Sequence, residues 1–315
     1  MYKQLPSYNV LMETLRKTIS TAWHLNTIHK RGIEKWLENF SGDALVDDLK
    51  DKDSAKELEH QIALFLLCNF VYYNEDEIKH LMKVMLEKYI HKYLLASQVR
   101  ECDENGIDEI IRKSKFSKLG NESESSAYML YLFRQINELS KKDFEDRDGV
   151  ENIVFVDDFS ITGSQAEWYI KKCLKDNPEI GNKKIYVLLM VSTEEAVRKI
   201  KTIPQVVDVL PCIVMDNTSK AFSDNSIIFQ GYSPELKEQA KKVCEYYGEL
   251  IKLSEEGSTP LGFGGGEYML GAYYNTPNNS IPIFWSEENN WKPFFKRYNK
   301  KYTADNGVRI GGQYV

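Results

Sequence analysis

The 315-residue sequence has few cysteines, and they show no pairing pattern. They are odd in number, scattered, and mostly set in apolar stretches: Cys68, Cys102, Cys173, Cys212 and Cys244. This distribution excludes a disulfide framework and a zinc site built from closely spaced cysteines. It is typical of buried thiols in a reducing compartment, so we expect a cytoplasmic protein.

Long apolar runs and an excess of positive charge are also absent. The longest apolar run, residues 62–73 (IALFLLCNFVYY), is too short to span a bilayer. The first residues, MYKQLPSYNVLMETLRK, lack the apolar core of a signal peptide, so we expect no membrane partner. The net charge of −6 argues against a general nucleic-acid binder, although it leaves room for a local basic patch.

Proline is missing between Pro6 and Pro178, and the first part of this stretch is predicted to be helical. Apolar residues recur at helical spacing over residues 8–29, 33–40, 55–73 and 75–95. All the histidines lie here: His24, His29, His60, His80 and His91. None has the i+4 partner and carboxylate of a metal or acid–base site, which favours solvated helix faces. We therefore expect residues 1–105 to form a helical domain that caps the rest or binds partners.

From residue 106 onward, strand-like segments alternate with helical ones. We expect strands at residues 107–116, 153–156, 184–192 and 206–215, and helices at 126–139, 166–174, 194–201 and 234–253. The segment 184–192 is continuously apolar, as in a strand covered on both faces, whereas residues 140–150 look disordered. This alternation predicts an α/β domain over residues 106–315, with a parallel sheet flanked by helices.

Residues 153–165 (IVFVDDFSITGSQ) combine an apolar strand, an acidic pair, a polar turn and the start of a helix. In an open α/β sheet, ligands bind at the carboxyl ends of strands, and the N–H groups of a helix N-terminus attract phosphate. The carboxylates of Asp157 and Asp158 are suited to accept hydrogen bonds from vicinal hydroxyls. The segment therefore predicts a site for a ribose 5-phosphate. The alternative is an ordinary strand that ends at a solvated acidic turn with an N-capping residue.

This segment resembles the ribose-phosphate loop of type I phosphoribosyltransferases: four apolar residues, Asp-Asp, three variable residues, Thr-Gly, one variable residue, and Ser or Thr. The last position is Gln165 here, so one side-chain donor differs, and Ser164 stands one place earlier. The resemblance implies that Asp157 and Asp158 bind the ribose hydroxyls of phosphoribosyl pyrophosphate or a nucleotide. The implied phosphate-binding residues are Thr162, Gly163, Ser164 and Gln165. The resemblance also implies Mg²⁺ on the pyrophosphate and ribose oxygens.

A second loop, residues 117–126 (SKLGNESESS), stands where this family has its pyrophosphate-binding loop, after the first core strand. The implied ligand-binding residues are Lys118, Gly120, Ser123 and Ser125. Glu122 and Glu124 are poor neighbours for a pyrophosphate unless a metal lies between them. The alternative is a polar connection in which Ser126 caps the next helix.

Residues 261–285 (LGFGGGEYMLGAYYNTPNNSIPIFW) are rich in glycine, asparagine and aromatic residues. In the family, a loop beyond the last core strands covers the base as a hood. Asn275 and Asn278 supply donors and acceptors for such a role, and Trp285 supplies a ring for stacking. Asparagine and glycine also form turns because both tolerate positive φ, and this is the favoured interpretation of Asn278.

The tail, residues 291–309, concentrates basic residues around aromatic ones. Such a mixture can contact phosphates and stack on bases. The favoured alternative is an aromatic anchor that docks the C-terminus, with its lysines in solvent. Residues 261–285 together with residues 291–297 resemble a divergent branch of phosphoribosyltransferase-like proteins that act as effectors in bacterial anti-phage systems, including retrons. The resemblance covers about residues 65–298. It implies a toxic effector controlled by proteins encoded beside it, such as a reverse transcriptase and a DNA-binding protein.

Three functional hypotheses remain. The leading one is an enzyme that acts at C1 of a phosphoribosyl or nucleotide ribose. The second is a nucleotide-sensing or scaffold protein that keeps the loop but lacks turnover, and the glutamates at 122 and 124 motivate it. The third is a nucleic-acid binder that uses the basic tail.

Overall fold

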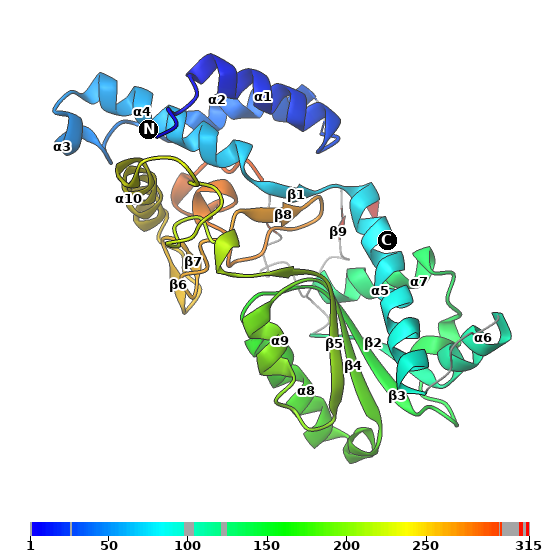
Figure 1. Ribbon diagram of the computed structural model, residues 1–315. Helices are drawn as coiled ribbons and strands as arrows, with labels where there is room; N and C mark the ends of the chain where they lie inside the picture. Colours follow the sequence, from blue (N-terminus) through cyan, green and yellow to red (C-terminus); the bar gives the residue numbers. More distant parts are fainter. Residues whose placement is uncertain are drawn as a thin grey trace. The chain divides into compact units, whose positions relative to one another are not determined.

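The computed structural model describes residues 2–25, 27–97, 104–120, 125–295, 297, 309–310 and 313–314 (Figure 1). The chain forms two compact units, one of residues 1–75 and 217–315 and the other of residues 76–216. The first unit thus combines the two ends of the chain. The sequence predicted contiguous domains over residues 1–105 and 106–315, and these bounds differ from those of the two compact units. That residues 1–105 and 106–315 are separate domains stays a prediction.

The unit of residues 76–216 is built on a four-stranded parallel sheet. Its strands lie side by side in sequence order: β2 (Ser114–Lys118), β3 (Asn152–Ser160), β4 (Lys184–Thr193) and β5 (Val206–Met215). Strand β5 lies at an edge of the sheet, where a proline such as Pro211 is tolerated. The expected fold class, a parallel α/β sheet flanked by helices, is confirmed.

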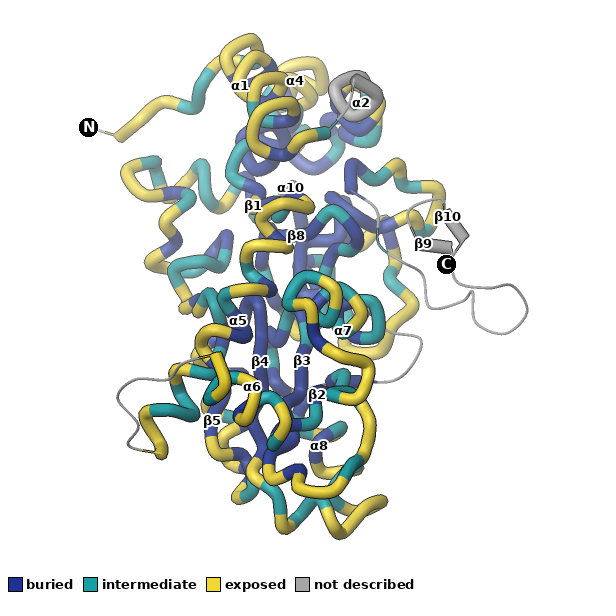
Figure 2. Tube along the Cα trace, turned by 90° about the vertical axis from the view of Figure 1, so that its right-hand side faces the viewer, coloured by how far each residue is buried: buried dark blue, intermediate teal, exposed yellow. Residues whose placement is uncertain are grey.

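Helices cover both faces of this sheet, which explains why β3 and β4 are buried along most of their length (Figure 2). The helices are α5 (Glu75–Ala96), α7 (Ser125–Ile136), α8 (Ser164–Asp176) and α9 (Glu194–Ile200). On one face, α8 and α9 share a buried cluster with strand residues such as Phe155 and Val187. On the other face, the Phe116 ring of β2 contacts Tyr89 of α5 and Phe133 of α7.

The strand expected at residues 107–116 is wrong for most of its length. Glu104–Arg112 form helix α6, and β2 begins only at Ser114. The isoleucines explain the difference, because Ile107, Ile110 and Ile111 recur at the period of a helix. A run that is rich in β-branched residues therefore folds according to its spacing rather than its composition.

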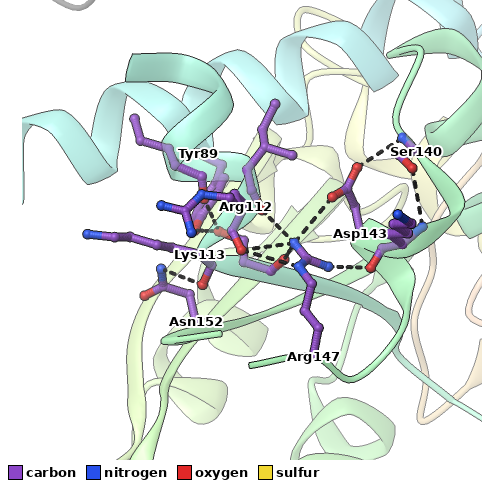
Figure 3. Close-up of polar contacts among 11 residues, drawn as sticks. Tyr89, Arg112, Lys113, Ser140, Asp143, Arg147 and Asn152 are labelled. Atoms are coloured by element: carbon purple, nitrogen blue, oxygen red, sulfur yellow. Dashed lines mark hydrogen bonds and ion pairs between the residues drawn. The ribbon is translucent and has the colours of Figure 1, made fainter. Parts of the chain in front are cut away.

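Residues 140–150, expected to be disordered, are instead held by hydrogen bonds (Figure 3). A short 3₁₀ helix, η1 (Lys141–Phe144), begins after Ser140, which forms a capping box with Asp143. The Arg147 guanidinium pairs with the Asp143 carboxylate at 3.2 Å. It also donates to the carbonyl oxygens of Ile111, Arg112 and Ser114, at 3.0, 3.0 and 2.8 Å. Carbonyls at the end of a helix lack intrahelical partners, so Arg147 supplies the donors that the C-terminal end of α6 requires.

The unit of residues 1–75 and 217–315 combines N-terminal helices with the C-terminal part of the chain. Its helices are α1 (Tyr8–Thr21), α2 (Thr27–Leu37), α3 (Val46–Leu49), α4 (Lys52–Cys68) and α10 (Pro234–Ile251). Its short strands are β1 (Val71–Tyr73), β6 (Ser258–Thr259), β7 (Gly262–Phe263), β8 (Leu270–Ala272), β9 (Arg309–Ile310) and β10 (Gln313–Tyr314). Four 3₁₀ turns complete the described elements: η3 (Asn217–Ser219), η4 (Pro282–Phe284) and η5 (Glu288–Asn290) in this unit, and η2 (Pro178–Asn182) in the other.

Two of the expected N-terminal helices are shorter than predicted. The helix expected over residues 8–29 ends at Thr21, and His24 beyond it has a positive φ of 54°. The helix expected over residues 55–73 ends at Cys68, and the residues after it form β1, which pairs with β8 in parallel. The apolar run at 62–73 is therefore helical up to Cys68 and a strand only over Val71–Tyr73.

The aromatic residues of the tail belong to the core of this unit. The rings of Phe295 and Phe70 stack with centroids 4.2 Å apart, and Phe294 is only 8% exposed. The Trp291 indole N–H donates to the Ile283 carbonyl oxygen at 2.8 Å. The aromatic anchor favoured from the sequence is thus confirmed for residues 291–295. Tyr298 and residues 299–308 lie outside the described residues.

The cysteines that the structure describes are free thiols, either buried or half-buried. Burial raises the pKa of Cys68 to about 12 and that of Cys212 to about 11, so both stay protonated at neutral pH. Cys102 lies outside the described residues. Within the described part of the chain, no helix combines the length and apolar character needed to cross a membrane.

Candidate functional site

The acidic pair lies within β3, not in a turn after it. The strand was expected to end at residue 156, but its pairing with β4 continues to Ser160. Asp157 is half-buried opposite Leu189 of β4. Asp158 is only 4% exposed, and its Oδ1 accepts the Phe159 N–H at 2.8 Å. Because side chains alternate along a strand, the two carboxylates start from opposite faces of the sheet.

The turn after the pair depends on Gly163. This residue is the N-cap of α8 and has φ 69° and ψ −6°, a left-handed conformation that favours glycine. A Cβ at this position would lie 2.9 Å from the Ala196 Cα and 3.0 Å from the Ala196 carbonyl oxygen. The turn therefore packs backbone to backbone against the first turn of α9.

Side chains at the end of β4 hold the carbonyl groups of the loop. The Thr193 hydroxyl donates to the Ile161 carbonyl oxygen at 2.6 Å, and the Ser192 hydroxyl donates to the Ser160 carbonyl oxygen at 2.9 Å. Thr193 also caps α9, as expected, because its Oγ1 accepts the Ala196 N–H at 3.0 Å. The loop is thereby fixed by the neighbouring strand and helix, without any ligand.

The predicted phosphate-binding residues lie at the start of α8. Thr162 is half-buried, and its Oγ1 accepts the Ser164 N–H at 3.4 Å. Ser164 and Gln165 are exposed in the first turn of the helix. The first N–H groups of a helix have no intrahelical acceptor and carry partial positive charge, so this end of α8 favours an anion.

A basic residue that the sequence did not indicate also lies at this helix end. The Lys199 ammonium group of α9 donates to the Ser164 Oγ at 2.8 Å. Lys199 also lies 3.7 Å from the carboxylate of Glu167, whose closer partner is Lys171 at 2.6 Å. Hydrogen bonding from Lys171 lowers the pKa of the Glu167 carboxyl. No local pattern predicts this contact, because Lys199 and Ser164 are 35 residues apart.

The second predicted loop begins beside the acidic pair. Lys118, the last residue of β2, lies opposite Val156, so β2 ends beside the residue that precedes Asp157, whereas β3 continues to Ser160. Gly120 follows with a φ of 141°. Ser125 begins α7, and Ser123 lies outside the described residues. The structure therefore places Lys118 and Gly120 at the same sheet edge as Asp157.

The predicted hood residues lie in the unit of residues 1–75 and 217–315 and make contacts within it. The Asn278 amide donates to Glu255 at 3.0 Å, and Asn275 forms a backbone bridge with Ala272. Trp285 is 7% exposed, its indole N–H donates to Ser280 O at 2.8 Å, and the Arg297 guanidinium lies 4.9 Å from its ring centroid. These contacts account for structural roles, and the role in covering a base stays a prediction.

Residues of the β3–α8 loop line neither of two hollows on the surface of the described residues. One of about 390 Å³ lies beside His60, and one of about 270 Å³ lies beside Glu87. Among the described residues, no three His, Cys, Asp or Glu side chains converge on a point suited to a metal ion. Carboxylates stand on both sides of the loop, those of Asp157 and Asp158 in β3 and that of Glu167 in the first turn of α8.

The parallel sheet and the acidic strand that leads through a glycine turn into a helix define a phosphoribosyltransferase-like protein. More specifically, residues 33–297 match the family described as PRTase-CE, and the chain belongs to this family. The match includes most of both compact units. No curated protein and no solved structure matches the chain.

Proposed function

We propose that this protein binds a ribose 5-phosphate ligand, either phosphoribosyl pyrophosphate or a nucleotide, at the β3–α8 loop and acts at ribose C1. The observation that carries the proposal is the turn at Gly163, which joins the acidic end of β3 directly to the N-terminus of α8. Carboxylates that can accept hydrogen bonds from ribose hydroxyls thus lie a few residues from N–H groups that can donate to a phosphate. Membership of the PRTase-CE family supports the same assignment.

In the proposed reaction, the bond between ribose C1 and its leaving group breaks, and the electron pair departs with the leaving group. The acceptor then bonds to C1 and loses its proton. Positive charge develops at C1 during this exchange, and the Asp157 carboxylate stabilises it. The leaving group is pyrophosphate for a phosphoribosyl pyrophosphate substrate and the base for a nucleotide.

Mg²⁺ is part of this proposal, and the residues of the loop are compatible with it. Mg²⁺ prefers oxygen ligands, and in proteins it is usually bound by one or two carboxylates together with water and substrate phosphate oxygens. Asp157 would offer a half-buried carboxylate to the ion, whereas Asp158 starts from the opposite face of the sheet and its Oδ1 already accepts the Phe159 N–H. When bound, the ion would neutralise charge on the pyrophosphate.

A second candidate function is a nucleotide sensor that binds the ligand without turnover. The burial of Asp158 favours it, because Oδ1 of this side chain already accepts a backbone N–H. Nucleic-acid binding through residues 291–295 is disfavoured, since Phe294 and Phe295 are buried in the core and offer no ring to a base. Contacts to nucleic acid through the rest of the tail stay a prediction.

The biological role that we propose is that of a cytoplasmic anti-phage effector. The resemblance of residues 65–298 to retron-associated effectors supports it. In this role, proteins encoded beside the gene, such as a reverse transcriptase and a DNA-binding protein, would restrain its activity. Expression with and without these neighbours tests the role: toxicity should depend on Asp157 and be suppressed by the neighbours.

Turnover is tested by incubating the protein with Mg²⁺ and either phosphoribosyl pyrophosphate or a nucleotide. We expect release of pyrophosphate or free base, and loss of this release in Asp157→Asn. Asp224→Asn, an exposed change in the other unit, is the matched control and should keep full activity. Tight binding without release over hours, also with the neighbouring proteins added, would establish the sensor instead.

A further inference from the structure

A cluster of charged side chains lies along the first two turns of α8. Two ammonium groups, Lys171 and Lys199, lie near a single carboxylate, Glu167. The closer pair is Glu167 with Lys171, at 2.6 Å, whereas Lys199 lies at 3.7 Å. Lys199 is instead hydrogen-bonded to Ser164, a neutral hydroxyl in the first helical turn. Of the two ammonium groups, that of Lys199 therefore has the weaker ion pair with Glu167.

The position of Lys199 is set by the packing that shapes the loop. Ala196 and Lys199 are three residues apart and so lie on the same side of α9. The Ala196 backbone is the part of α9 that Gly163 approaches, and Lys199 reaches Ser164 one residue further along the loop. The same contact between α9 and the turn therefore brings the ammonium group to the helix end.

We propose that Lys199 is a phosphate-binding residue of this site and makes it selective for phosphorylated ribose. The inference rests on the proposed function, because it takes the β3–α8 loop as the ribose-phosphate site. Gln165 removes a hydroxyl donor that the resemblance expects in the loop, and Lys199 supplies a charged donor from α9 in its place. A hydrogen bond to an anion is stronger when the donor is an ammonium group than when it is a hydroxyl.

The substrate class follows from this charge. The ligand would be a ribose that carries a 5′-phosphate, such as phosphoribosyl pyrophosphate or a nucleoside monophosphate. A nucleoside lacks the 5′-phosphate, so it would have no anion to place beside the Lys199 ammonium group at the N-terminal end of α8. We therefore expect the site to bind a phosphorylated ribose more tightly than an unphosphorylated one, because Lys199 contacts the phosphate.

The test is a calorimetric titration of the full chain with two probes, ribose 5-phosphate and ribose, at low ionic strength. Lys199→Gln should weaken the binding of ribose 5-phosphate by roughly tenfold or more, as expected for a lost hydrogen bond to an anion. Any weak binding of ribose should not change. The matched control is Lys175→Gln, which removes the same charge from the last turn of α8 and should leave both affinities unaltered.

A second variant moves the affinity in the opposite direction. Glu167→Gln removes the carboxylate that competes for Lys199, so it should tighten the binding of ribose 5-phosphate several-fold. If Lys199→Gln binds ribose 5-phosphate as the unchanged protein does, the role of Lys199 is wrong and the proposed function stands. If the unchanged protein binds neither ribose 5-phosphate nor phosphoribosyl pyrophosphate with Mg²⁺, the role of Lys199 and the proposed function are both wrong.

Discussion

Gly163 and Ala196 approach so closely that a side chain at residue 163 would lie 2.9 Å from the Ala196 Cα. The positive φ of Gly163 adds a second requirement for glycine. The contact joins the loop after β3 to the first turn of α9, so the loop keeps its shape through protein contacts alone. A preformed loop binds a ligand without first having to become ordered.

The first prediction concerns this contact. Gly163→Ala should lower the free energy of unfolding by roughly 2–4 kcal/mol, because it combines backbone strain with overlap in a packed region. Gly149→Ala is the matched control, since Gly149 also has a positive φ, of 80°, but a Cβ there meets nothing within 4 Å. Its cost should be limited to strain, roughly 1–2 kcal/mol. Urea unfolding of both variants checks this, and equal costs would contradict the packing contribution.

The second prediction separates the two aspartates. Asp157→Asn should abolish ligand binding and change the free energy of unfolding by less than about 1 kcal/mol, as for other partly exposed polar groups. Asp158→Ala should lower it by roughly 1–3 kcal/mol, because it removes a buried side chain that accepts the half-buried backbone N–H of Phe159. Thermal unfolding and calorimetry together check the pair. A large loss of stability in Asp157→Asn would make that residue structural.

The third prediction concerns Arg147. Replacing it by alanine removes the donor to carbonyl groups at the end of α6 and the ion-pair partner of Asp143, which should cost roughly 2–3 kcal/mol. Lys141→Ala changes an exposed residue in the same segment and should cost less than about 0.5 kcal/mol. Ligand binding should survive both changes, since Arg147 contacts the residues that precede and begin β2, whereas the loop follows the carboxyl end of β3 (Figure 3). Urea unfolding of the two variants measures the difference.

The fourth prediction concerns pH. Burial by itself would raise the pKa of Asp208 in β5, but hydrogen bonds from Lys201 and Lys92, at 2.6 and 2.5 Å, outweigh it and lower the pKa below its usual value of 3.8. A lowered pKa in the folded state stabilises the protein above the unfolded value, and this contribution disappears as pH falls through the folded value.

The check is the difference in unfolding free energy between the unchanged protein and Asp208→Asn, measured from pH 7 down to about pH 3. Near neutral pH, the variant should be less stable by roughly 1–2 kcal/mol, because two lysines lose their carboxylate partner. The difference should shrink as pH falls below 3.8, where the unfolded state binds the proton. A difference that stays constant over this range would rule out the ion pairs as its cause.

The sequence predicted strands correctly in segments whose apolar pattern fits a strand and no helix. The strands at 184–192 and 206–215 are confirmed. Residues 184–192 are a continuous apolar run, which fits a strand that is covered on both faces. The prediction was wrong at residues 107–116, where β-branched composition and helical spacing disagreed. It was also wrong for residues 140–150, since polar residues are ordered there by Arg147, a contact between distant segments.

The site was predictable to the same extent. The acidic pair and the turn at Gly163 are contiguous in sequence, so the pattern of residues 153–165 indicated them together. The contacts of Ala196 and Lys199 with the loop were not predictable, because they depend on how α9 packs against α8. The face of the sheet from which each aspartate starts also required the strand to be seen continuing to Ser160.

The most direct test of the central claim is a crystal structure of the chain with phosphoribosyl pyrophosphate and Mg²⁺. We predict that the 5′-phosphate lies against the N–H groups of residues 162–165, next to the Lys199 ammonium group, with the ribose hydroxyls on the side of Asp157. A ligand bound elsewhere on the chain, or a β3–α8 loop that stays without ligand at saturating concentration, would contradict the account.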